Sequence, residues 1–477
     1  MKRALTIGLV VAMLAGCQSV SPDGGLSLVQ ESVKTEIGKD IVKIIDEESA
    51  KAADGRARAL LRKGLTAERV VQIALLNNKG LQAAYNELGM SEARFVQASL
   101  PPNPSLSILD VRGHLEFSIE RRLIGDLLAL ATLPARREIA QAGWRKAQLE
   151  AVAATLRLAG DVRRQYWRAV SANTLASYLQ EARAAVEITS ELVRKLGETG
   201  AMNKLDQARE HAFYAEVSAQ LARARTQQGV EKERLARLMG LWGRERSFTL
   251  AANLPALPGK LASSKDIEQR ALARRVDLKL ARAQLDQVAL ELGLTNATRY
   301  VSAVEVSLAN YASGKTTVDA SGVTKDRSNL FGAELKIEIP IYDFGEAKVR
   351  GAQETYMRAA NLMVETAVNI RSQAREAYIA YKGAHDVARL YQTKVLPLRK
   401  TIQDESTLHY NGMLSDLFVL LQDARARITS NIAAIEARRE FFLAAVELQG
   451  ALLTGGASDA VMMSASAPLA PGGKDAH

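Results

Sequence analysis

The chain contains little cysteine and few aromatic residues. Cys17 is the only cysteine among 477 residues, so no disulfide can form within the chain. Aromatic side chains make up 5% of the residues, whereas alanine, leucine and arginine are abundant. This balance favours long helices over a β-sandwich or a doubly wound sheet.

The residue patterns of enzymes are also missing. The five histidines show no spacing typical of metal ligands. The sequence has no nucleophile elbow, no phosphate-binding loop and no cysteine–histidine pair. Glu116 and Glu120 are the nearest approach to a catalytic carboxylate pair, but they share one face of a predicted strand. We therefore expect no catalytic residue, no metal and no cofactor.

The formal net charge is +10, a value that raises the question of nucleic acid binding. The basic residues are spread along helical stretches among many acids, and no basic cluster is interleaved with aromatics. Charges arranged in this way are typical of solvated helix faces. We expect no nucleic acid partner.

The N-terminus has the pattern of an exported lipoprotein. Lys2 and Arg3 precede an apolar run, Ala4–Ala15, that is shorter than the roughly 20 residues of a membrane-spanning helix. Small residues then lead to Cys17, which predicts cleavage after residue 16 and a lipid such as palmitate on Cys17. The alternative is an ordinary secretory leader with a chance cysteine. Gln18 differs from the aspartate typical of bacterial inner-membrane retention.

Two halves of the chain share landmarks. Ala74-Leu75 recurs as Ala271-Leu272, and further on Tyr166, Gly200 and Leu205 recur as Tyr378, Gly412 and Leu417. These recurrences predict an internal duplication, with repeats over 65–258 and 259–457. The distance between a landmark and its recurrence is longer for the later landmarks than for Ala74-Leu75, so the second repeat would contain an insertion. We place it in a polar, glycine-containing loop at Ala312–Asn329.

Each repeat is predicted to run helix, strand, strand, long helix, return helix. The first helices are expected at 65–99 and 265–298. Four short segments alternate apolar and polar residues, as strands wetted on one face do; they are 105–112, 115–120, 304–308 and 334–339. A soluble sheet packed on helices would alternate in the same way.

Aromatic spacing favours a membrane sheet. Tyr300 and Tyr311 bracket one strand, and Phe331 and Tyr342 bracket another, each pair eleven positions apart. That separation is about 28 Å of height at ~40° tilt, close to the ~25 Å apolar band of membrane barrels. Four strands cannot close a barrel, since the smallest use about eight. Strands must be pooled, eight in a dimer or twelve in a trimer.

The two long helices are predicted at Arg136–Leu196 and Glu346–Tyr410. Each would reach about 90–100 Å, and both are too charged for lipid, so they must extend into water. The first return helix carries alanines spaced four, three, four, three, which predicts a closely packed seam; they are Ala208, Ala212, Ala215, Ala219 and Ala222. Alanine also simply favours helix. Pro397 is expected to kink the second long helix.

With these residues in view, the chain resembles the TolC-like outer-membrane factors of tripartite efflux systems, in their lipoprotein branch. The matching segments are "ALLNNKGLQAAYNELGMSEARFVQASLPPNPSL", "LKIEIPIYDFGEAKVRGAQETY", "LGETGAMNKLDQAR" and "YNGMLSDLFVLLQDAR". The resemblance covers the chain from about Leu65 to Gly455. The resemblance implies a mainly α fold with membrane β-structure: a homotrimer with a 12-stranded β-barrel, four strands per chain, and a helical coiled-coil tunnel.

The resemblance also implies a role and partners. The protein would be a passive export duct in the outer membrane of a Gram-negative bacterium, with its helices in the periplasm. Its partners would be a periplasmic adaptor, an inner-membrane RND-type pump and outer-membrane lipid. Cargo selection is expected to lie in the pump, because a duct needs only width and lumen charge. The segments 17–64 and 458–477 are expected to be flexible.

Three groups of residues follow from this resemblance. Charged strand residues would line the lumen: Glu116, Glu120, Glu305, Glu334, Lys336 and Glu338. Two hairpin tips would dock the adaptor: Gly197, Gly200, Met202, Gly412 and Met413. Any helical hairpin, however, favours glycine at its turn.

The third group is a gate just after the second tip. In the resembling family, acids six and nine residues past the tip glycine can ring the closed mouth. Phe418 and Leu421 hold those positions here, with Asp416 nearby but out of register. We expect an apolar constriction, the alternative being that Phe418 and Leu421 are ordinary packing residues.

A rival class uses the same helices. A periplasmic coiled-coil lipoprotein, acting as a scaffold or an efflux adaptor, would also combine a lipid anchor with long hairpins. It would need neither the aromatic spacing nor four amphipathic strands.

Overall fold

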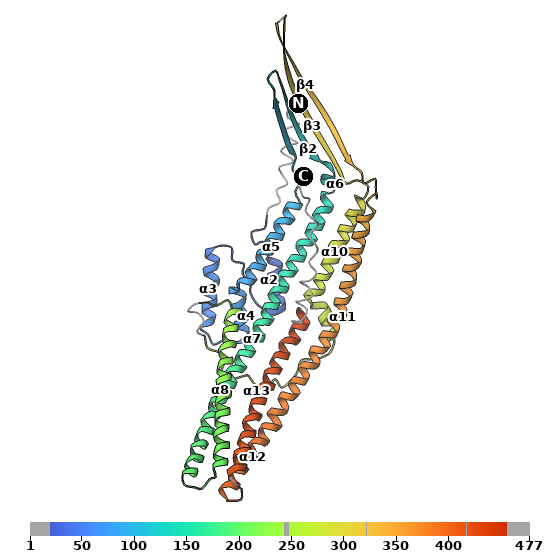
Figure 1. Ribbon diagram of the computed structural model, residues 1–477. Coiled ribbons are helices and arrows are strands. Elements are labelled where there is room, and N and C mark those ends of the chain that lie inside the picture. The colour runs from blue at the N-terminus through green and yellow to red at the C-terminus, as the bar shows by residue number, and fades with distance from the viewer. Residues whose placement is uncertain (1–19, 243–247, 321, 416, 456–477) are drawn as a thin grey trace. The chain divides into compact units, whose positions relative to one another are not determined.

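The computed structural model describes residues 20–242, 248–320, 322–415 and 417–455. By contacts, the chain divides into two compact units, and each unit takes pieces from both halves of the sequence. Unit 1 contains the sheet with helices that adjoin it, and unit 2 contains the helical hairpins (Figure 1). The predicted lipidation site Cys17, the gate residue Asp416 and the tail 458–477 lie outside the described residues.

In each half of the sequence, two helices come first, two strands follow, and long helices end the half. Ahead of the first half, the segment expected to be flexible contains two helices, α2 (Ser27–Ile37) and α3 (Glu47–Leu61). The first half then comprises α4 (Ala67–Asn77), α5 (Lys79–Ala98), β1 (Ser105–Arg112), β2 (Glu116–Asp126), α6 (Leu127–Ala131), α7 (Leu133–Glu198) and α8 (Lys204–Leu238). The second comprises α9 (Ile267–Arg274), α10 (Val276–Ala297), β3 (Ala303–Asp319), β4 (Gly322–Glu338), α11 (Glu346–Leu390), α12 (Leu396–Asn411) and α13 (Leu417–Leu453).

The helices expected at 65–99 and 265–298 are each broken once. The breaks fall at Asn78 (ψ 116°) and Arg275 (ψ 126°), both in extended conformation. Asn78 caps the next helix, because its Oδ1 accepts from the Leu81 amide at 3.0 Å. The side chain of Arg275 is 1% exposed and pairs with Asp277 at 2.5 Å.

The second long helix changes its hydrogen-bonding pattern directly before Pro397. Residues Tyr391–Val395 form a π-helical segment, η2, directly before α12, whose first turn contains Pro397. A proline ring clashes with the carbonyl four residues back and lacks the N–H that would bond it. A single wide turn relieves this conflict while the helix continues.

The segment Ala312–Asn329, predicted to be an inserted loop, is paired β-structure. β3 and β4 pair from Ala303↔Glu338 to Asp319↔Gly322, so almost all of Ala312–Asn329 lies in the hairpin ladder. Threonine and valine favour strands, and they occur among the polar residues of this segment. Gly314 and Gly322, which suggested a loop, both belong to the ladder, Gly322 in its last pair. In particular, a Cβ on Gly314 would collide with the ring of Phe117.

The alanine seam predicted on α8 faces outward. Ala208, Ala212, Ala215, Ala219 and Ala222 are all exposed. The buried row is instead Glu210, Val217, Leu221 and Ala224, on the opposite side of the helix at 100° per residue. In unit 2, Leu221 and Ala224 pack with Ala176 and Leu179 of α7, and Ile432 of α13 lies against them.

Candidate functional site

The four strands form one antiparallel sheet in the order β1-β2-β3-β4 (Figure 1). Directly paired residues point to the same face of a sheet, and successive residues alternate. The register therefore assigns every strand residue to one of two faces. All six residues predicted to line a lumen share one of them, here called the charged face: Glu116, Glu120, Glu305, Glu334, Lys336 and Glu338.

Ion pairs cross the charged face between strands. Arg122, which the sequence analysis did not single out, pairs with Glu334 of β4 at 3.4 Å and with Glu120 of its own strand at 2.6 Å. Lys336 pairs with Glu305 at 3.3 Å. The sequence could have identified Arg122 as a residue of the charged face, because it lies two residues after Glu120 in the same strand. These contacts fix the register of β2, β3 and β4.

The opposite face, here called the apolar face, is open over most of its area. Exposed side chains on it include Leu106 (66%), Leu308 (57%), Phe331 (81%), Leu335 (60%) and Ile337 (50%). A soluble sheet packed on its own helices would bury these residues. A contiguous apolar surface of this kind indicates contact with lipid or with another protein.

The aromatic pairs do not form two girdles as predicted. Tyr311 lies on the charged face, where its hydroxyl is 3.4 Å from Arg122, while Phe331 lies on the apolar face. Eleven residues is an odd spacing, so an alternating strand must place its two ends on opposite faces. Tyr300 and Tyr342 lie just outside the strands and are 56% and 98% exposed.

The hairpin tips form in unit 2 with the same turn. At the first tip, the Ala201 amide donates to Leu196 at 2.8 Å, and Gly200 takes a φ of +75°. At the second, the Leu414 amide donates to His409 at 2.8 Å, and Met413 takes a φ of +58°. Both are helix C-terminal turns that need one left-handed residue.

The second tip therefore differs from its prediction. The left-handed position is Met413 and not Gly412, whose φ is −83°, so Gly200 of the first tip corresponds in geometry to Met413 and not to Gly412. Gly197 and Met202 flank the first turn, where Gln207 donates to the Met202 carbonyl at 2.9 Å. At the second tip Met413 is 94% exposed and Leu414 is 75% exposed.

Side chains behind the tips join α8 to α13. The Arg209 guanidinium lies 5.7 Å from the ring centre of Phe418, which is 44% exposed, and Leu421 is half-buried. Deeper in the bundle, Arg425 pairs with the buried Glu210 at 3.0 Å and stacks on Phe213 at 4.4 Å. Nothing in the sequence distinguished Glu210, because an acid in a helix is usually solvated.

Across residues 20–455, outside the three undescribed gaps, no group of three histidine, cysteine or acidic side chains is placed to hold a metal ion. In the same residues, no helix is both long enough and apolar enough to cross a membrane.

Solved structures share this arrangement. The Vibrio cholerae outer membrane protein VceC superimposes with a TM-score of 0.63 at 17% identity, over 82% of this chain and 96% of VceC. The chain has the fold of the TolC-like outer-membrane efflux channels. The open-state channel MtrE of Neisseria gonorrhoeae gives 0.66 at 19% identity, over 81% and 88%, and the Campylobacter jejuni channel CmeC gives 0.65 at 16%, over 81% and 85%.

No protein-family model and no curated protein matches this sequence. At such low sequence identities, the TolC-like likeness concerns the fold. These neighbours are channel proteins and not enzymes.

Proposed function

We propose that this protein is the outer-membrane channel of a tripartite efflux system, a passive duct from periplasm to exterior. The observation that carries the proposal is the sheet with one exposed apolar face and one charged face. A strand sheet in a membrane needs lipid on one side and water on the other. A soluble coiled-coil scaffold, the rival function, would leave the apolar face in water.

The open edges of the sheet support a homotrimer. Within the described part of the chain, β1 and β4 each pair on one side only, and unpaired edges are not tolerated inside a membrane. Joining β4 of one copy to β1 of the next closes a 12-stranded barrel from three chains. The exposed alanine row of α8 supports the same assembly, because small side chains let helices of neighbouring copies approach closely.

The ends of the duct would be served by other parts of the chain. Cys17 anchors the mature N-terminus through lipid, and the tips around Gly200 and Met413 contact the periplasmic adaptor of an RND-type pump. Exposed apolar side chains at the second tip, Met413 and Leu414, suit such docking. Phe418 and Leu421 narrow the closed end.

Membrane fractionation with the lipid anchor removed separates the channel from the scaffold. Residues 1–17 are replaced with a cleavable secretory leader, so that no lipid can be attached. We expect the unlipidated protein to stay in the outer membrane and to cross-link as a trimer. A scaffold held by its lipid alone would instead be released with the soluble periplasmic proteins.

Cys17 itself is tested by mass spectrometry of the mature wild-type protein, which should begin with a lipid-modified Cys17. An unmodified N-terminus at another residue would contradict the anchor without affecting the channel.

A further inference from the structure

The apolar face also carries basic residues, three of them near one end of the sheet. By register, this face carries Arg112, Arg121, Lys325 and Arg327 against a single acid, Asp110. The charged face, by contrast, carries more acids than bases. A cation on a surface otherwise built for lipid is costly at mid-membrane and tolerated near the interface, so its position on the face matters.

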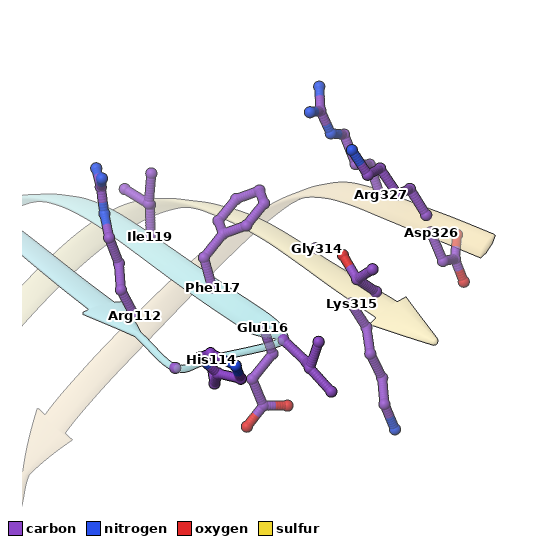
Figure 2. A pocket seen from close by; sticks show the side chains of 13 residues that line it. Arg112, His114, Glu116, Phe117, Ile119, Gly314, Lys315, Asp326 and Arg327 are labelled. Atoms are coloured by element: carbon purple, nitrogen blue, oxygen red, sulfur yellow. The ribbon is translucent and has the colours of Figure 1, made fainter. Parts of the chain in front are cut away.

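The strongest concentration lies in one row across all four strands. Arg112 pairs with Phe117, Phe117 with Gly314, and Gly314 with Arg327. The Phe117 ring lies over Gly314, which has no side chain to displace it. The Phe117 ring is thus flanked by the guanidinium groups of Arg112 and Arg327 (Figure 2). By register, Lys325 lies two residues before Arg327 on the same face.

This row borders a hollow of about 440 Å³ where the β1–β2 turn meets β3 and β4. Arg112, Phe117, Ile119 and Arg327 point to one side of the strands, and Glu116 and Lys315 point to the other (Figure 2). Arg112 is bound to Asp110 at 3.0 Å, and Arg121 donates to Asn310 at 3.1 Å. Among the described residues, Lys325 and Arg327 have no acid at ion-pair distance.

The height of the row matches the edge of the membrane. The apolar face starts at the Val304↔Ile337 pair, ten residues from the Gly314↔Arg327 pair. Ten residues at ~40° tilt rise about 25 Å, the height of the apolar band in membrane barrels. The row therefore falls where lipid headgroups begin, at the end of the sheet away from the helices.

We propose that Arg112, Lys325 and Arg327 form a binding site for the phosphate groups of an outer-leaflet lipid, whose acyl chains cover the apolar face below. Arginine and lysine bind phosphate through charge-assisted hydrogen bonds, and Phe117 supplies apolar contact beneath the headgroup. The inference rests on the proposed channel function, because it needs the apolar face to be turned toward lipid.

The test measures binding of fluorescent bisphosphorylated lipid A to the purified full-length protein in dodecyl maltoside micelles. The variant Lys325→Gln/Arg327→Gln removes two cations from the site. The control variant Lys348→Gln/Lys382→Gln removes two exposed cations elsewhere, both of them in α11. We expect the first variant to bind at least about tenfold more weakly and the control to bind like wild type.

Competition binding and conductance measurements provide two further tests of the lipid site. Lipid A stripped of phosphate should compete poorly, and inorganic phosphate at equal concentration should not compete. Equal binding by all variants, or equal competition by free phosphate, would overturn the proposal. So would unchanged lipid binding with altered anion selectivity, because the cluster would then face the pore.

A conductance recording of the wild-type protein distinguishes failure of the lipid site from failure of the proposed channel function. A wild-type protein that conducts but does not prefer phosphorylated lipid contradicts only the lipid site. A wild-type protein that forms no channel contradicts the proposed function itself.

Discussion

Single residues matter most where a charge is buried. The Glu210 side chain is 2% exposed and its partner Arg425 is 32% exposed. Replacing Glu210 with alanine leaves Arg425 without its acid inside the bundle. We expect a loss of about 2 kcal/mol, less than the ~3–5 kcal/mol of fully buried pairs because Arg425 keeps some solvent contact.

Chemical denaturation of the detergent-solubilised protein measures this loss. The matched control is Glu216→Ala on the same helix, where the residue is exposed and the change should be within about 0.5 kcal/mol. Equal midpoints for the two variants would show that the ion pair contributes nothing.

A second residue predicts pH dependence. Burial alone would raise the pKa of Glu68, but hydrogen bonds from Arg163 and Lys39 outweigh it and hold that pKa below its ordinary value of 4.5. A depressed carboxyl pKa gives stability that is present above the ordinary pKa and is lost as pH falls through the folded one. Thermal unfolding should show Glu68→Gln less stable than wild type at pH 7, with the gap in stability closing as the pH falls below the ordinary pKa of 4.5. A constant gap across this range would exclude the linkage.

The gate is a proposal at the same scale. Phe418→Ala should raise single-channel conductance in planar bilayers, because it removes bulk from the proposed apolar constriction. Asp416→Ala should change conductance less, and divalent cations should block only weakly. Strong divalent block that Asp416→Ala abolishes, with Phe418→Ala silent, would show an acidic gate instead.

The position of a residue could be predicted from the sequence where it depends on local geometry alone. Strand alternation predicted that six charged residues share one face, and the strand register places all six on one face. The prediction for Tyr311 was wrong, because it considered only the length of the strand. Residues an odd number of positions apart in a strand lie on opposite faces of the sheet. Glu210 and Arg425 escaped notice because their burial depends on contacts between α8 and α13, which local sequence does not encode.

At the scale of elements, the exposed side of α8 gives the clearest prediction. Arginine at Ala215 would place a long charged side chain in a tight helix contact between copies. We expect overpacking of about 1–3 kcal/mol to weaken trimer formation roughly tenfold, while helix content stays unchanged. Size-exclusion chromatography with light scattering measures the oligomer.

Gln220→Arg is the matched control, since Gln220 is exposed on α8 but lies off the alanine row. Both variants remaining trimeric would remove the alanine row from the interface.

Elements were predicted better than their interruptions. Period two and period 3.6 gave β1 and the long helices to within a few residues, whereas β2 and the β3–β4 hairpin are longer than predicted. The breaks at Asn78 and Arg275 are set by packing, because Arg275 reaches Gln373 on α11 in the same unit. The alanine spacing on α8 was recognised correctly, but periodicity cannot say which row of a helix faces its own chain.

The whole molecule is accounted for by one claim: the sheet spans the outer membrane and several copies enclose a pore. That claim explains why an apolar face lies exposed in the single chain and why both sheet edges are unpaired. It also explains why long charged helices adjoin a sheet, since they extend the duct into water.

Planar-bilayer recording of the purified full-length protein tests this claim most directly. We predict discrete conductance steps from the trimeric wild type, larger steps from Phe418→Ala, and few or none from Ala215→Arg. Stable insertion of wild type and Phe418→Ala as trimers without any conductance would contradict the account.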